Sequence, residues 1–320
     1  MTIADHDLAT EERIGRDALG DDAWEALIDR LNQQSITKRH DAYLDVAWDD
    51  PANAIDAEDP RWIPAAEGLL GETVWWDTLD DATRARLGLH LVAHRMRSGV
   101  VFESVLSRGL LAYAAGLDNG SSEFRYAYHE VIEESQHSLM FQEFVNRTGL
   151  ETGPLPLRLR LGAQQVVKLA TRFPELFFVF VLGGEDPIDH VQRQALREGA
   201  EHPLLERIMR IHVTEEARHL SFARHQLKRR IATLGRPKRA ALAYTAPVVL
   251  ALMADQMMGL PDHLVAEYDI PDEVVRSVRR DPQHEADVNA SLNKVRRLLD
   301  ECGLLTTGPR RLWSRLGLET

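Results

Sequence analysis

The chain contains two short motifs whose residue types and spacing are typical of metal ligands. Glu134 and His137 form one Glu-x-x-His motif, and Glu216 and His219 form another. Residues three apart lie on one face of an α-helix, so each pair would present a carboxylate and an imidazole in the same direction. Two such pairs on separate helices are typical of a dinuclear metal site inside a helical bundle. The motifs therefore predict such a site.

A complete site of this kind also needs one glutamate from each of two further helices. Glu103 and Glu185 are the candidates, because each is a charge within an apolar stretch, where an unpaired carboxylate is costly. Glu103 precedes Glu134 by 31 residues, and Glu185 precedes Glu216 by 31 residues. This repeated interval predicts that one helix–turn–helix unit occurs twice in an antiparallel bundle.

His212 extends the second motif by one turn. With 100° of rotation per residue, His212, Glu216 and His219 fall within an arc of about 60° on a helix. The equivalent position in the first half is Glu130. One metal would therefore gain an additional imidazole. The alternative is a histidine that only supports a ligand or faces solvent.

Two further glutamates, Glu133 and Glu215, each lie one turn before a candidate ligand histidine. A carboxylate at this position can accept a hydrogen bond from a ligand imidazole and fix its orientation. It can equally face water. The sequence leaves both interpretations open.

The elements that must position these residues are predicted to be helices. Acidic residues at Asp80 and Asp81, serines at 121 and 122, and prolines at 174 and 203 mark helix starts, and Gly149 marks a helix end. The predicted helices are 22–32, 80–117, 121–147, 158–171, 175–198, 203–234, 240–258, 273–280 and 285–299. Alternation typical of β-strands is absent beyond a few residues. The fold class is therefore all-α, with a four-helix bundle at about 80–234 and additional helices around it.

We expect a single domain overall. Residues 1–79 read as an N-terminal helix and loop extension packed on the body, and 80–320 as the helical domain that holds the metals. Three prolines and several acids between residues 49 and 64 indicate a loop. Tryptophans at 48, 62, 75 and 76 indicate that this extension packs against the body.

Composition excludes several classes of protein. The formal net charge of −12 argues against a general binder of nucleic acid or anionic membranes, because both reward a basic surface. The single cysteine, Cys302, excludes an intrachain disulfide and is compatible with a reducing cytoplasm. Met1 to Asp21 lacks the apolar core of a signal peptide. The longest apolar run, 240–254, is shorter than a membrane span and is predicted to be a core helix.

The candidate ligands together resemble a known family. The set is Glu103, Glu134, His137, Glu185, His212, Glu216 and His219. It is similar to the ligand set of the p-aminobenzoate N-oxygenase (AurF-type) family of ferritin-like di-iron oxygenases, which the additional histidine distinguishes. The resemblance covers residues 80–234 and implies a ferritin-like four-helix bundle core with peripheral helices.

The resemblance also implies roles for the ligands. Glu103, Glu134 and His137 would hold one iron. The second iron would be held by Glu185, His212, Glu216 and His219, and Glu134 and Glu216 would bridge the two metals. Characterised members oxidise an aryl amine to the hydroxylamine and nitro level with dioxygen.

The predicted function is therefore a di-iron oxygenase that uses O2 to oxidise a small organic substrate, with N-oxygenation of an aryl amine favoured. A ferredoxin or reductase is expected as external electron donor. A mixed manganese–iron pair and a homodimer are compatible with the sequence. Three alternatives stay open: a di-iron hydroxylase or desaturase acting on carbon, a ferritin-like ferroxidase, and a helical protein without metal. His212 disfavours the first, the added helices the second, and the repeated interval the third.

Overall fold

The computed structural model describes residues 18–153, 157–199 and 202–318. In these ranges the chain forms α-helices and short 3-10 turns, with no β-strand. The predicted all-α fold class is therefore confirmed. Most of Met1 to Asp21, where no signal peptide is predicted, lies outside the described residues.

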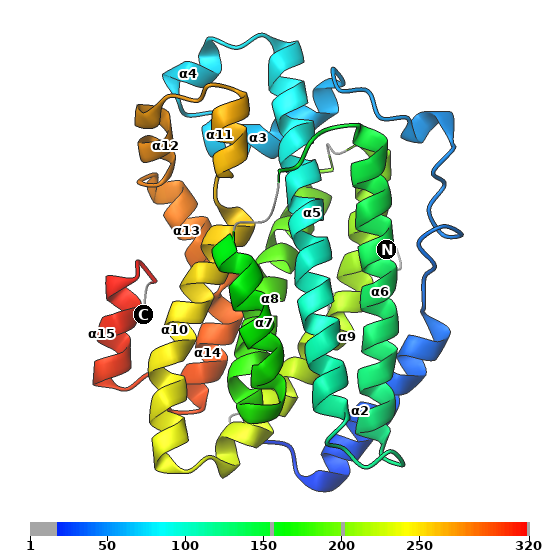
Figure 1. Cartoon of the computed structure of the whole chain (residues 1–320), viewed down its shortest axis with the longest axis vertical. Helices are drawn as coiled ribbons and strands as arrows, with labels where there is room; N and C mark the ends of the chain where they lie inside the picture. Colours follow the sequence, from blue (N-terminus) through cyan, green and yellow to red (C-terminus); the bar gives the residue numbers. More distant parts are fainter. Residues whose placement is uncertain (1–17, 154–156, 200–201, 319–320) are drawn as a thin grey trace.

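Four long helices form the centre of the molecule (Figure 1). They are α5 (Asp81–Ala114), α6 (Ser122–Thr148), α8 (Pro174–Glu198) and α9 (Pro203–Thr233). α5 packs along α6, and α8 packs along α9, so the bundle consists of two helical hairpins. α6 also contacts α9, and α5 contacts α8. This is the predicted helix–turn–helix unit in two copies, and the architecture is consistent with a ferritin-like fold.

The helix boundaries follow local chemistry. Asp80 and Ser121 each accept a hydrogen bond from the backbone N–H three residues on, which satisfies a donor that the first turn leaves free. Gly149 ends α6 in a left-handed conformation with φ of 66°, which a residue without Cβ adopts easily. Pro174 and Pro203 occupy the first turns of α8 and α9, where the missing N–H costs nothing. These boundaries agree with the sequence prediction.

Peripheral helices cover the bundle. α7 (Leu157–Arg172) packs on α5 and α8, and α2 (Asp21–Thr37) packs on α6 and α9. The remaining α-helices are α3 (Ile63–Leu70), α4 (Val74–Asp77), α10 (Arg236–Met258), α11 (Asp262–Glu267), α12 (Asp272–Val278), α13 (Pro282–Ser291), α14 (Asn293–Glu301) and α15 (Thr307–Arg315). The predicted single helix 285–299 is wrong, because the chain breaks at Leu292 with φ of −89° and ψ of 0°.

α10 is the apolar helix of the sequence analysis. Within the described ranges, the stretch Arg236–Glu267 is the one long and apolar enough to cross a membrane by length and composition, and 44% of its apolar window is buried. Leu242, Ala246 and Leu250 on α10 are buried, and Leu250 lies against Gly183 of α8. This packing supports the prediction of a core helix.

The segment before α5 lies on the bundle. Trp48, Trp62 and Trp76 are buried, as the sequence predicts, and Trp75 is half-buried. Gly88 of α5 lets the backbone of Trp62 lie directly against α5, because a Cβ at position 88 would lie 1.9 Å from the carbonyl oxygen of Trp62. The division of the chain at residue 79 stays a prediction.

Candidate metal centre

All seven predicted ligands converge on one buried region between the four bundle helices. α5 supplies Glu103, α6 supplies Glu134 and His137, α8 supplies Glu185, and α9 supplies His212, Glu216 and His219. Each of these residues is at most 2% exposed. The repeated interval therefore does bring the two halves of the ligand set together.

Glu134 and Glu216 lie between two histidines. His137 Nδ1 is 3.0 Å from Glu134 Oε2 and 3.4 Å from Glu216 Oε1. His219 Nδ1 is 2.9 Å from Glu134 Oε1 and 3.0 Å from Glu216 Oε1. Each carboxylate thus lies within 3.4 Å of both imidazoles.

His212 points its ring into the same region. Its Nε2 lies 3.6 Å from Glu103 Oε1 and 3.6 Å from Glu216 Oε1. Its Nδ1 lies 2.9 Å from Gln192 Oε1, and an amide oxygen only accepts hydrogen bonds. The proton is therefore on Nδ1, and the lone pair of Nε2 faces Glu103 and Glu216. Gln192 was not predicted, although it follows Glu185 by seven residues and so shares its helix face.

Within the described part of the chain, four groups of ligand atoms lie within 4.8 Å of one another. They are Glu103–His137–His212, Glu134–His137–Glu216, Glu185–His212–Glu216 and Glu103–Glu134–Glu185. Since these groups share members, the residues form a single cluster rather than separate sites. His212 belongs to groups with both Glu103 and Glu185, so it lies between the two halves of the ligand set.

The cluster contains several buried carboxyl groups, and without a bound cation burial disfavours their ionised form. Burial and the neighbouring Glu134 raise the pKa of Glu103 well above its usual range, and burial and Glu216 do the same for Glu185. Burial also raises the pKa of Glu130 to about 8. For His137, burial lowers the pKa, but the hydrogen bonds that its ring donates to Glu134 and Glu215 outweigh burial and raise the pKa to about 10. Bound cations would compensate this charge and keep the carboxylates ionised.

Several buried donor atoms fit a metal pair. Glu103 Oε2, Glu185 Oε1, Glu216 Oε2 and His212 Nε2 have no hydrogen-bond partner among the described residues. Buried polar atoms are otherwise almost always paired. Carboxylate oxygens and imidazole nitrogens are ligands that suit iron and manganese. The residues present therefore fit the group that the sequence predicts.

Comparison with known proteins agrees with this geometry. The family model described as P-aminobenzoate N-oxygenase AurF matches residues 21–303. The chain belongs to the AurF family. Relatives include the uncharacterized proteins MT0908 of Mycobacterium tuberculosis (strain CDC 1551 / Oshkosh) and Mb0909 of Mycobacterium bovis (strain ATCC BAA-935 / AF2122/97). Each is 36% identical over 303 residues, covering 94% of this chain and 89% of the relative.

Membership of the AurF family confirms the resemblance and extends it beyond the bundle. The matched range starts at α2 and ends after α14. The family is one of oxygenases, which supports an enzyme that uses O2 and a substrate, and its members depend on a di-iron centre. The buried glutamate and histidine cluster is where this AurF-family chain could hold metal.

The two outer glutamates support histidines across the bundle. Glu215 Oε2 of α9 lies 2.9 Å from His137 Nε2 of α6, and Glu133 Oε2 of α6 lies 2.7 Å from His219 Nε2 of α9. Both glutamates are at most 1% exposed, so the solvent-facing interpretation is wrong. Each glutamate orients the histidine of the other hairpin rather than the one on its own helix.

The glycines before Glu185 allow close helix packing. A Cβ at Gly184 would lie 2.2 Å from the ring of Phe102, and a Cβ at Gly183 would lie 3.0 Å from Leu250. Phe102 in turn lies against Phe180, with ring centroids 5.1 Å apart. The space beside Gly184 is therefore filled by an aromatic ring.

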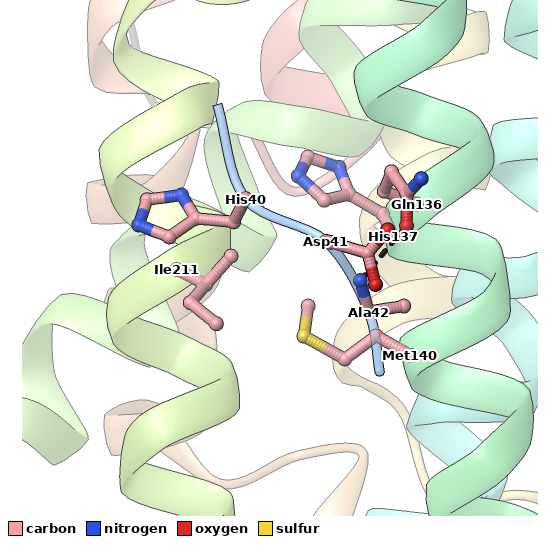
Figure 2. Close-up of a pocket in the computed structure, with 7 residues that line it drawn as sticks. All are labelled: His40, Asp41, Ala42, Gln136, His137, Met140 and Ile211. Atoms are coloured by element: carbon pink, nitrogen blue, oxygen red, sulfur yellow. Dashed lines mark hydrogen bonds between the residues drawn. The ribbon is translucent and has the colours of Figure 1, made fainter. Parts of the chain in front are cut away.

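A crevice too narrow to hold a water molecule lies on the outer side of His137, which is itself fully buried. Figure 2 shows the segment with His40, Asp41 and Ala42 running between α9 and α6. The crevice is lined by these residues together with Gln136, His137, Met140 and Ile211. No regular pattern in the sequence connects His40 with α6 or α9, so it was not among the predicted residues.

Proposed function

We propose that this chain is a di-iron N-oxygenase that uses O2 to oxidise an aryl amine to the hydroxylamine and nitro level. The observation that carries the proposal is His212. Its unpartnered Nε2 faces Glu103 and Glu216 inside a cluster of AurF-type composition. Membership of the AurF family supports oxygenase activity. The aryl-amine substrate is proposed by analogy with characterised members of the family.

We propose the ligand roles that the family resemblance implies. One iron would be held by Glu103, Glu134 and His137, and the other by Glu185, His212, Glu216 and His219. Glu134 and Glu216 would bridge, and their distances to both His137 and His219 support this role. A mixed manganese–iron pair would use the same ligands.

The bound metals would supply the redox chemistry that activates O2. The protein's own residues position and enclose that chemistry. Gln192 orients the ring of His212 through a hydrogen bond to its Nδ1. The phenyl ring of Phe141 lies against the His212 ring, with centroids 5.1 Å apart. Phe141 also stacks on His137 at 6.2 Å. These aromatic contacts exclude water from the outer side of both imidazoles.

The test uses purified protein loaded anaerobically with ferrous iron and then exposed to O2 with p-aminobenzoate. Mass spectrometry should detect hydroxylamine and nitro products. Glu216→Ala should abolish them, because this residue contacts both histidines. The matched control is Glu206→Ala, which removes a carboxylate of the same helix that pairs with Arg210 at the surface.

The other outcomes separate the alternatives. Two bound irons and O2 uptake without nitrogen oxidation would favour an oxidase acting on carbon. Oxidation of excess ferrous iron with accumulation of ferric mineral would favour a ferroxidase. Failure of the wild-type protein to bind iron would overturn the metal centre.

Several further features belong to the same proposal. An N-oxygenase needs electrons, so we propose an external ferredoxin or reductase as donor. We also propose a cytoplasmic location, a homodimeric assembly, and a single domain in which residues 1–79 pack on 80–320. The acidic composition supports a protein that binds neither nucleic acid nor anionic membranes.

A further inference from the structure

His40 connects the N-terminal segment with the metal centre. Both its backbone N and its Nδ1 lie close to Glu215 Oε1, at 3.0 Å and 3.1 Å. The other oxygen of Glu215 lies 2.9 Å from His137 Nε2. A continuous series of hydrogen bonds therefore runs from a residue outside the bundle to a candidate ligand of one metal.

The opposite metal position has a different partner. Glu133, which supports His219, is paired with Arg218 of α9 at 2.9 Å. The side chain of Arg218 is 5% exposed, whereas that of His40 is 24% exposed. One outer carboxylate is thus compensated inside the bundle by a guanidinium. The other lies 3.6 Å from the same guanidinium, too far for a hydrogen bond, and makes its outer hydrogen bonds with His40, which a separate segment contributes next to solvent.

The segment that carries His40 is fixed on both sides. Ala42 N donates to Gln136 Oε1 at 2.8 Å, and Trp48 Nε1 donates to the carbonyl of Ala42 at 2.7 Å. Arg207 of α9 donates to the carbonyl of Asp45 at 3.0 Å. Figure 2 shows this segment between the helices that carry His137 and Ile211. His40 is therefore held in place rather than free to leave Glu215.

We propose that His40 is a positioning residue for the metal held by His137, and that the two metal positions consequently differ in how firmly they are supported. His40 holds Glu215, and Glu215 holds the His137 ring with its Nδ1 toward the cluster. Loss of such an outer partner typically lowers metal affinity about 10–100-fold. Because the backbone N of His40 would still donate to Glu215 after substitution, we expect the lower end, about 10-fold. This inference rests on the proposed di-iron site.

The test measures how many irons bind and how tightly, and it needs no catalytic turnover. Wild-type protein, His40→Ala and His40→Leu are titrated anaerobically with ferrous iron against a chelator, and iron-57 Mössbauer spectra are recorded. We expect the wild type to bind two irons. In both variants one of the two should bind about 10-fold more weakly, and the other should be unchanged. His40→Asn restores a side-chain donor near the Nδ1 position and should recover the lost affinity.

Two further comparisons identify the affected position. His284→Ala removes a partly exposed histidine on α13 and should change neither affinity. In a His137→Ala background, His40→Ala should have no added effect, because that position is already lost. In a His219→Ala background, the remaining iron should bind more weakly when His40 is also replaced.

Four results would overturn the inference. If the wild type binds two irons and both affinities survive in His40→Ala and His40→Leu, the inference fails while the proposed function stands. The same holds if both affinities fall equally or if His40→Asn gives no recovery. If the wild type binds no iron, the proposed function fails and the inference fails with it.

Discussion

Gln192 shows how a neutral side chain can decide the chemistry of a ligand. Its amide oxygen accepts from His212 Nδ1 and leaves Nε2 facing Glu103 and Glu216. Burial lowers the pKa of His212 to about 4, so without metal the ring stays neutral at pH 7. A neutral imidazole with a fixed tautomer is ready to bind a cation.

We therefore predict that Gln192→Ala lowers iron affinity by about 10–100-fold, with product formation falling in parallel, because His212 loses its orienting partner. Anaerobic iron titration and product formation measure the effect. Gln194→Ala is the control, since Gln194 lies on the exposed side of α8 and pairs with Glu198. Equal iron affinity in the two variants would show that Gln192 has no orienting role.

At this scale the convergence of the seven candidate residues was predictable, because helical periodicity and a repeated interval both constrain them. Glu130 was recognised only as the counterpart of His212, and its burial came from the structure. Gln192 shares a helix face with Glu185, a signal that is easily overlooked. His40 follows no periodicity, because a loop brings it to Glu215 from far away in the sequence.

At the scale of elements, helices with a clear capping residue or a proline in the first turn could be predicted from the sequence. Asp80, Ser121, Gly149, Pro174 and Pro203 mark bundle helices at the observed positions. Short helices such as α4 (Val74–Asp77) and α11 (Asp262–Glu267) were missed, because so few residues show no clear helical period. The break between α13 and α14 at Leu292 was also missed, because no glycine or proline near Leu292 marks a helix end in the sequence.

The approach of the N-terminal segment to α5 gives a prediction about an element interface. Gly88→Ala should destabilise the protein by about 1–3 kcal/mol, because the new Cβ meets the Trp62 carbonyl, and backbone cannot move aside easily. Urea denaturation measures the free energy of unfolding. Gly162→Ala on α7 meets no described atom within 4 Å, so it should be neutral or stabilise by up to about 1 kcal/mol. Equal stability of the two variants would contradict the close contact.

At the scale of the whole molecule, a cluster of histidines joins the bundle to the C-terminal part. His94 of α5 lies against His263 of α11, with ring centroids 4.6 Å apart, and His90 lies 5.6 Å from His263. Burial and then the neighbouring His263 lower the pKa of His94 from its ordinary 6.5 to about 4. This packing therefore favours the neutral form of His94.

The cluster predicts how stability depends on pH. The unfolded chain binds a proton at His94 near pH 6.5, whereas the folded chain resists it until about pH 4. The contribution of His94 is therefore complete above pH 6.5 and falls as the pH drops toward 4, by at most about 3 kcal/mol. Chemical denaturation of metal-free protein at pH 7 and pH 5 measures this. His94→Gln should show a smaller loss than the wild type; an equal loss would contradict the prediction.

The bundle and its internal repeat were predictable at this scale, because long periodic helices dominate that part of the sequence. How the N-terminal segment and the helices after α10 are placed was not. Their positions depend on single contacts, such as His263 against His94 or the carbonyl of Trp62 against Gly88, which leave no periodic pattern.

The crossed support of the two histidines makes the hairpins mutually dependent. His137 belongs to the α5–α6 hairpin but relies on Glu215 of α9, and His219 belongs to the α8–α9 hairpin but relies on Glu133 of α6. A single hairpin of this type could orient its histidine only by pairing with a second copy related by a twofold axis. The internal repeat is the arrangement that a fused pair of such hairpins would retain. The pairs His137–Glu215 and His219–Glu133 therefore tie the two hairpins together, so that replacing either outer glutamate removes a support from the histidine of the other hairpin.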